Sequence, residues 1–216
     1  MTFPKAQKGI KRIYIAQFFL LSGSILLVLL ALSNMLLHAM YKIQPTDSVL
    51  TMVSSVIYIV SVVSMLTGIL LNIIGIINAS GDDENFKVAL YSLGFEFIFS
   101  VVGFILTSDS VIGSITSLLT TLTSFLIIIY IIEGIRNLAQ KLNQSKIDHR
   151  GNILYTLFSV FYVLETCANV AVLVFSDTEA MVVVYIIQVG INLMRVVQSL
   201  LFVLYLGKAK KMLTDH

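Results

Sequence analysis

Long apolar runs separated by short polar connectors occupy almost the whole chain. Six of these runs approach the roughly 20 residues that a helix needs to cross the hydrocarbon core of a bilayer. Apolar and polar residues do not alternate within them, as they would in transmembrane strands. The pattern therefore predicts an all-α integral membrane bundle of six helices, over approximately residues 13–38, 50–77, 87–107, 111–133, 152–175 and 181–206.

The connectors are short, which favours antiparallel helical hairpins within a single transmembrane domain over residues 1–216. The longest connector begins with Ile135, Leu138 and Leu142, which are spaced to share one face of a helix. We therefore expect the fourth helix to continue beyond the membrane as an amphipathic extension over about residues 134–148.

Composition supports this class. Hydrophobic residues make up 57% of the 216 residues and charged residues 12%, whereas soluble domains carry about 25% charged residues. The single cysteine, Cys167, excludes an internal disulfide and a metal site built from several cysteines. We expect no cofactor, and the lipid bilayer is the one partner that the composition implies.

The distribution of basic residues predicts an orientation. Twelve of the fourteen lysines and arginines fall at the N-terminus, the C-terminus or the connectors on the same side, whereas only Lys42 lies on the opposite side. Basic residues in short loops favour the cytoplasmic side of a membrane. Both termini are therefore expected to be cytoplasmic.

Two segments suggest an internal repeat. "LYSLGFEFIF" from Leu90 resembles "LYTLFSVFYV" from Leu154, and the second, fourth and sixth runs each end near a glycine. This pattern favours three related helical hairpins, as transporters often contain internal repeats. The alternative is that apolar helices with a glycine near a basic end resemble one another by composition alone.

Three ionisable residues lie near the middle of their predicted helices: Glu96, Glu165 and Arg195. Such residues within transmembrane segments usually face the bundle interior and mark functional sites. Neighbouring polar residues fall on the same helical faces. Together they define a candidate midplane polar site, which comprises Glu96, Glu165, Asn169, Gln188, Asn192, Arg195 and Ser199.

The other helices carry stripes of small and polar residues at intervals of about seven. The first has Gln17 and Ser24, the second has Ser61, Gly68 and Gly75, and the fourth has a hydroxyl-rich run, "SITSLLTTLTS". We interpret the stripes of the second and fourth helices as packing surfaces, because small residues allow close approach and hydroxyls bond between helices.

Energetics favour a partner for Arg195. An arginine at a helix centre costs about 2.5–3.5 kcal/mol on insertion scales, which the apolar residues of the sixth helix offset. An unpaired charge inside the finished bundle remains costly. We predict a buried ion pair or triad of Arg195 with Glu165, Glu96 or both. A structural pair that fixes helix register and a midplane site that binds a cation or relays a proton both remain open.

Enzyme signatures are missing, so no catalytic activity is predicted. The chain has no phosphate-binding "GxxxxGK[ST]", no "HExxH" and no "GxSxG". An activity driven by ATP would need a separate ATPase subunit. The basic inner surface follows from topology and from attraction to anionic lipids, so no nucleic-acid partner is expected.

The segments "FPKAQKGIKRIYIAQFF" and "ASGDDENFKVAL" resemble uncharacterised small multi-pass membrane proteins of anaerobic Firmicutes. The resemblance covers mainly the first half of the chain. It implies location in a bacterial cytoplasmic membrane, and it transfers no functional residues.

The sequence thus favours a non-enzymatic membrane protein related to transport. It would be either a small transporter or a substrate-binding membrane subunit with a polar midplane. The competing interpretation is a structural or accessory subunit whose buried charges only fix helix packing.

Overall fold

The computed structural model describes residues 2–41, 48–105, 110–175 and 181–215. Within these ranges the chain forms six helices and no strand. The predicted all-α class and the number of helices are confirmed. The helices are α1 (Pro4–Tyr41), α2 (Ser48–Ala79), α3 (Asn85–Ile105), α4 (Ser110–Lys141), α5 (Ser145–Phe175) and α6 (Met181–Thr214).

The helices have the length and polarity of membrane spans. Among the described residues, five stretches are long and apolar enough to cross a membrane, one in each of α1 to α5. Large apolar side chains face outward along α2, where Leu66 and Leu70 are 56% and 60% exposed. Such a surface is stable only against lipid or another apolar partner. The chain is an all-α membrane bundle.

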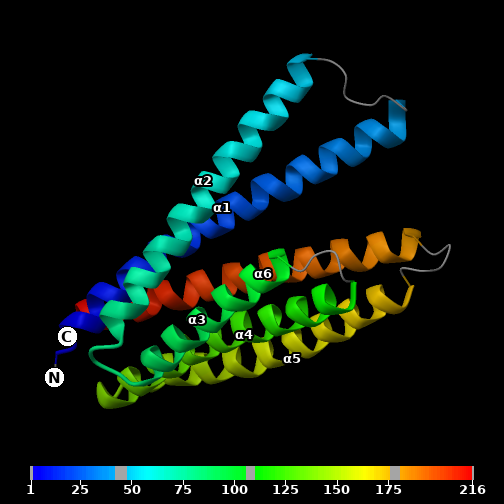
Figure 1. The fold of residues 1–216 in the computed structure, drawn as a ribbon. Coiled ribbons are helices and arrows are strands. Elements are labelled where there is room, and N and C mark those ends of the chain that lie inside the picture. Colours follow the sequence, from blue (N-terminus) through cyan, green and yellow to red (C-terminus); the bar gives the residue numbers. More distant parts are fainter. Residues whose placement is uncertain (1, 42–47, 106–109, 176–180, 216) are drawn as a thin grey trace.

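The six helices separate into two groups away from the end that holds both termini (Figure 1). The hairpin of α1 and α2 leans away from the group formed by α3 to α6. Helix α1 packs along α2 and also contacts α6, while α2 meets α3 near the turn that joins them. The two groups therefore converge at one end of the molecule and diverge toward the other.

Helices α1 and α2 meet along a seam of small residues. A Cβ added to Gly9 would lie 2.5 Å from the carbonyl oxygen of Gly75, and one added to Gly68 would lie 3.0 Å from that of Ala16. A Cβ on Gly23 would likewise lie 3.0 Å from the carbonyl oxygen of Ser61. Small residues at seven-residue intervals thus bring the two backbones close together. The stripe predicted on α2 is this packing surface. On α1 the matching positions precede Gln17 and Ser24 by one residue.

The tightly packed core lies at the end with the termini, which also holds the turns at residues 80–84 and 142–144 and is called the closed end below (Figure 1). Apolar side chains from all six helices meet there. Phe86 of α3, Ile132 of α4 and Leu206 of α6 are fully buried. Phe86 lies against Gly134, where an added Cβ would come within 2.6 Å of its ring. The bundle is therefore sealed at this end.

Helix α4 continues past residue 133 as far as Lys141 but does not reach residue 148. Asn143 adopts a φ of 56°, in the left-handed region. The backbone N–H groups of Asn143 and Gln144 then donate to the carbonyl oxygens of Gln140 and Ala139, at 3.0 and 2.8 Å. These two bonds form a Schellman cap, which ends the helix and lets α5 start at Ser145.

Candidate functional site

Arg195 of α6 forms an ion pair with Glu165 of α5, the helix that precedes it in the chain. The Nε of Arg195 donates to Oε1 of Glu165 at 2.8 Å, and Nη2 donates to the same oxygen. The pairing arises because α5 and α6 run antiparallel, which brings the middle of one helix beside the middle of the other. The structure therefore contains one of the ion pairs that the sequence predicts.

The two partners differ strongly in burial. The side chain of Glu165 is 8% exposed, whereas that of Arg195 is 52% exposed. The sequence prediction placed both groups in a buried pair, and for Arg195 that is wrong. The bundle thus encloses most of the Glu165 side chain and leaves the Arg195 side chain half-exposed.

Glu96 of α3 does not complete a triad. Its Oε1 accepts a hydrogen bond from Oγ of Ser124 on α4. Within the described residues, the ion pair of Arg195 is with Glu165 and not with Glu96. The predicted Arg195–Glu96 contact is therefore absent from this part of the chain. Glu96 instead links α3 to the hydroxyl-rich run of α4.

A cavity of about 650 Å³ lies beside the Arg195–Glu165 pair. Five helices line it: α1, α3, α4, α5 and α6. Arg195 and Glu165 are its charged lining residues, and neutral polar groups surround them. These neutral polar residues are Gln17, Ser24, Ser100, Thr116, Ser117, Thr120, Thr121, Ser124, Tyr162, Gln198 and Ser199.

Many of the hydroxyls along α4 are oriented by their own helix. Thr120 donates to the carbonyl oxygen of Thr116 at 2.8 Å, and Thr121 donates to that of Ser117 at 3.0 Å. A hydroxyl whose proton is used in this way still has oxygen lone pairs to offer. This part of the wall therefore presents hydrogen-bond acceptors without adding a charge.

Aromatic rings form the apolar part of the wall. Phe125 and Tyr162 stack with their centroids 4.5 Å apart and an interplanar angle of 17°. Phe158 meets Phe202 edge-on toward the closed end, and both also line the cavity. The cavity therefore combines one charged pair, several neutral polar groups and a set of flat apolar surfaces.

The other predicted site residues have different positions. Ser199 lines the cavity one helical turn from Arg195, whereas Asn169 on α5 is not among its lining residues. Gln188 and Asn192 belong to α6, but their side chains lie outside the described residues.

Several cavity residues were missed or were assigned only a packing role. Gln198 is absent from the predicted site, although it lies three residues from Arg195. The hydroxyl-rich run of α4, which we interpreted as a packing surface, lines the cavity instead. Its density of Ser and Thr was the available signal, because packing alone does not require so many hydroxyls.

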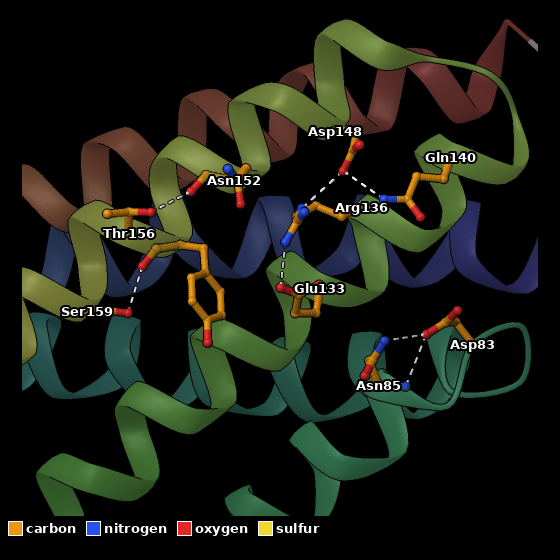
Figure 2. Close-up of polar contacts among 10 residues, drawn as sticks. Asp83, Asn85, Glu133, Arg136, Gln140, Asp148, Asn152, Thr156 and Ser159 are labelled. Carbon is orange, nitrogen blue, oxygen red and sulfur yellow. Dashed lines mark hydrogen bonds and ion pairs between the residues drawn. The ribbon is translucent and has the colours of Figure 1, made fainter.

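The closed end carries a second polar cluster, which is built around Arg136. Figure 2 shows Arg136 of α4 between two carboxylates. Nη1 contacts Oε1 of Glu133 at 2.6 Å, and Nε contacts Oδ1 of Asp148 at 3.0 Å. Gln140 also donates to Asp148, at 3.2 Å. This cluster joins the last turn of α4 to the first turn of α5 and has a structural explanation.

The turn before α3 is held in a similar way. Asp83 is 5% exposed in its side chain and accepts a hydrogen bond from the backbone N–H of Asn85 at 3.0 Å (Figure 2). Lys141 approaches the other oxygen of Asp83 at 3.2 Å. Asp82 accepts from the backbone N–H of Ala6 at 2.7 Å. The acidic turn thus caps α3 and ties it to α1 and α4.

Comparison with protein-family models, with curated proteins and with solved structures finds no match to this chain. Arguments about function therefore rest on the cavity and its residues.

Proposed function

We propose that this protein binds a small polar solute in the cavity beside Arg195, as a small transporter or as the substrate-binding membrane subunit of a larger system, without a catalytic step of its own. The observation that carries the proposal is the half-exposed guanidinium of Arg195 on the wall of a 650 Å³ cavity.

The dimensions of the cavity support this function. Pockets for small molecules typically have volumes of about 300–1,000 Å³ and combine apolar walls with a few placed polar groups. The cavity has such a volume, and its walls contain both the stacked Phe125–Tyr162 pair and the hydroxyls of α4. A rigid packing interface would place apolar side chains in this space.

The shape of the bundle suggests one route of entry. Phe158 and Phe202 line the cavity on the side of the closed end, and buried Ile132 and Leu206 lie beyond them. The α1–α2 hairpin diverges from the other helices in the opposite direction (Figure 1). With both termini in the cytoplasm of a bacterial cell, the solute enters from outside. The orientation and the membrane are part of the proposal.

Cysteine labelling in proteoliposomes tests the proposal. In a Cys167→Ser background, Ser199→Cys and Thr120→Cys place thiols on the cavity wall. Leu200→Cys is the matched control, since Leu200 neighbours Ser199 on α6 and faces outward with 46% exposure. We expect small membrane-impermeant methanethiosulfonates to modify both cavity cysteines and to leave the lipid-facing cysteine unmodified.

The outcome separates the proposal from its rival. If both cavity cysteines stay unmodified in folded protein and react after denaturation, the cavity is closed to water. The pair of Arg195 and Glu165 then serves helix packing, as in an accessory subunit.

A further inference from the structure

We infer that the solute carries an anionic group, and that this group binds the edge of Arg195 that Glu165 leaves unoccupied. The inference rests on the proposed function and adds the class of ligand, a small organic anion such as a carboxylate. Its basis is the geometry of the ion pair, the unequal burial of its partners and the neutrality of the remaining lining groups.

The guanidinium of arginine has five N–H donors in a fixed planar arrangement. Glu165 occupies one edge, because Nε and Nη2 of Arg195 both point to its Oε1. The adjoining edge, between Nη1 and Nη2, has the same spacing of parallel N–H groups and suits a second planar oxyanion. Glu165 thereby orients the guanidinium and leaves that edge available to a ligand.

Burial determines which charge a ligand meets. The side chain of Glu165 is 8% exposed, whereas that of Arg195 is 52% exposed, and both residues line the cavity. An incoming solute therefore meets more of the cation of the pair than of its anion. The sequence analysis left open a site in which a carboxylate would bind a cation. In the structure the more exposed group of the pair is instead the guanidinium, which binds anions.

No other charged residue lines the cavity among the described residues. The second carboxylate of the region, Glu96, accepts a hydrogen bond from Ser124 and does not form part of the wall. It acts on a ligand only through its field, from behind the hydroxyl of Ser124. The charged groups on the wall are thus Arg195 and Glu165, and Arg195 is the more exposed of the two.

The neutral lining residues indicate the chemistry of the rest of the ligand. Gln17 and Gln198 offer amide donors and acceptors, and Thr120 and Thr121 offer oxygen lone pairs. Phe99 and Phe125 add flat apolar surface. An organic anion with a hydrogen-bonding or aromatic body fits this wall better than a bare inorganic anion.

Charge-selective labelling tests the preference. Ser199→Cys in the Cys167→Ser background places a thiol one turn from Arg195. We compare its reaction rate with the anionic sulfonatoethyl methanethiosulfonate and with the cationic trimethylammonioethyl analogue. Each rate is divided by the rate of the same reagent with free 2-mercaptoethanol. We expect a normalised preference for the anion of about tenfold, within the range by which charged clefts concentrate counter-ions.

Matched variants assign the preference to Arg195. The double variant Arg195→Gln/Glu165→Gln removes both charges, keeps the side chains near their size and leaves no unpaired buried carboxylate. It should abolish the preference for the anion and bring the normalised ratio to one or below, because Glu96 remains in place. Glu96→Gln keeps Arg195 and should raise the preference for the anion.

A protection experiment tests binding directly. Benzoate, benzyl alcohol and benzylammonium share a ring and differ in charge. We expect benzoate alone to slow modification of Ser199→Cys, and we expect that protection to disappear in the double variant. Protection by benzylammonium to an equal or greater degree would overturn the inference.

The failures of the two proposals are distinguishable. Equal normalised rates for both reagents, together with protection that ignores charge, overturn the anion preference and leave a solute-binding cavity. If neither reagent reacts with the cavity cysteine, the cavity is closed to water, and the proposed function is overturned as well.

Discussion

Among the residues that the structure describes, two arginines form ion pairs, and they differ in how their side chains are held. Arg136 at the closed end has two carboxylate partners, Glu133 and Asp148, and its side chain is 18% exposed. Arg195 beside the cavity has one carboxylate partner and is 52% exposed. Within the described part of the chain, the guanidinium of Arg136 is bound from two directions, whereas that of Arg195 is bound along its Nε–Nη2 edge alone.

Their surroundings explain the difference. Arg136 lies where α4 turns into α5 through the cap at Asn143, so partners from both helices reach it and apolar side chains fill the space nearby. Arg195 lies beside hydroxyls that do not fill the cavity, which Gln17 and Ser24 of α1 also line. The comparison teaches that an enclosed arginine with carboxylates on two sides holds helices together. An arginine that is half-exposed and has one carboxylate partner can also bind a ligand.

The largest expected effect contrasts packing in the two regions. Phe86→Ala removes a fully buried ring at the closed end and should lower stability by about 3–5 kcal/mol, because the cavity it leaves cannot collapse fully. Phe99→Ala enlarges an existing cavity and should cost much less. The check is the thermal unfolding of both variants in the same detergent. Equal losses would mean that the cavity region is as tightly packed as the closed end.

A second, smaller effect tests the asymmetry within the Arg195 pair. Arg195→Gln leaves the enclosed carboxylate of Glu165 without its ion partner and should cost about 3 kcal/mol, at the low end for breaking a buried pair because the cavity borders it. Glu165→Gln leaves a half-exposed guanidinium that solvent can screen, and it should cost less than about 1 kcal/mol. Melting temperatures of the two variants provide the measurement, in detergent and again in lipid nanodiscs.

The reverse ranking would show that Arg195, and not Glu165, is the enclosed partner. No change for Arg195→Gln in either environment would remove the ion pair as a feature of the folded protein.

A third effect concerns the ion-pair cluster of Arg136, Glu133 and Asp148 at the closed end. Arg136→Gln should lower stability by about 1–2 kcal/mol, since it removes two charge-assisted bonds from carboxylates that are each 28% exposed. Labelling of Ser199→Cys should stay unchanged, because the residues of this ion-pair cluster do not line the cavity. The control is Arg150→Gln, which removes an exposed arginine with no ion pair among the described residues. If Arg136→Gln also altered labelling, the two regions would be coupled.

Sequence reasoning predicted the fold well because the bilayer imposes strong constraints. A span needs about 20 apolar residues, and each such run became part of one helix. It also brought Glu165 near Arg195, since a short connector fixes two antiparallel helices in depth. The exposure of Arg195 and the hydrogen bond between Ser124 and Glu96 could not be predicted, because they depend on how the neighbouring helices rotate and pack, which the length and polarity of each run do not fix.

The seam between α1 and α2 illustrates the same limit. The small residues of α2 were recognised from their seven-residue spacing, whereas Gly9, Ala16 and Gly23 of α1 were not singled out beside the polar stripe of Gln17 and Ser24. A shift of one residue turns a helical face by about 100°. It therefore separates Ala16, which packs on α2, from Gln17, which lines the cavity.

The smallest expected effect tests whether an ion pair stabilises the closed end only when its carboxylate is buried. Lys87 lies 3.9 Å from Glu84, and their side chains are 52% and 93% exposed. Lys87→Gln should leave the melting temperature within experimental error, because water and salt screen such a pair. Lys141→Gln removes the partner of Asp83, which is 5% exposed, and should give a measurable decrease. Both changes remove one lysine near the acidic turn, so net charge is matched. Equal responses would mean that overall charge at the closed end, and not burial of the carboxylate, sets the stability of that turn.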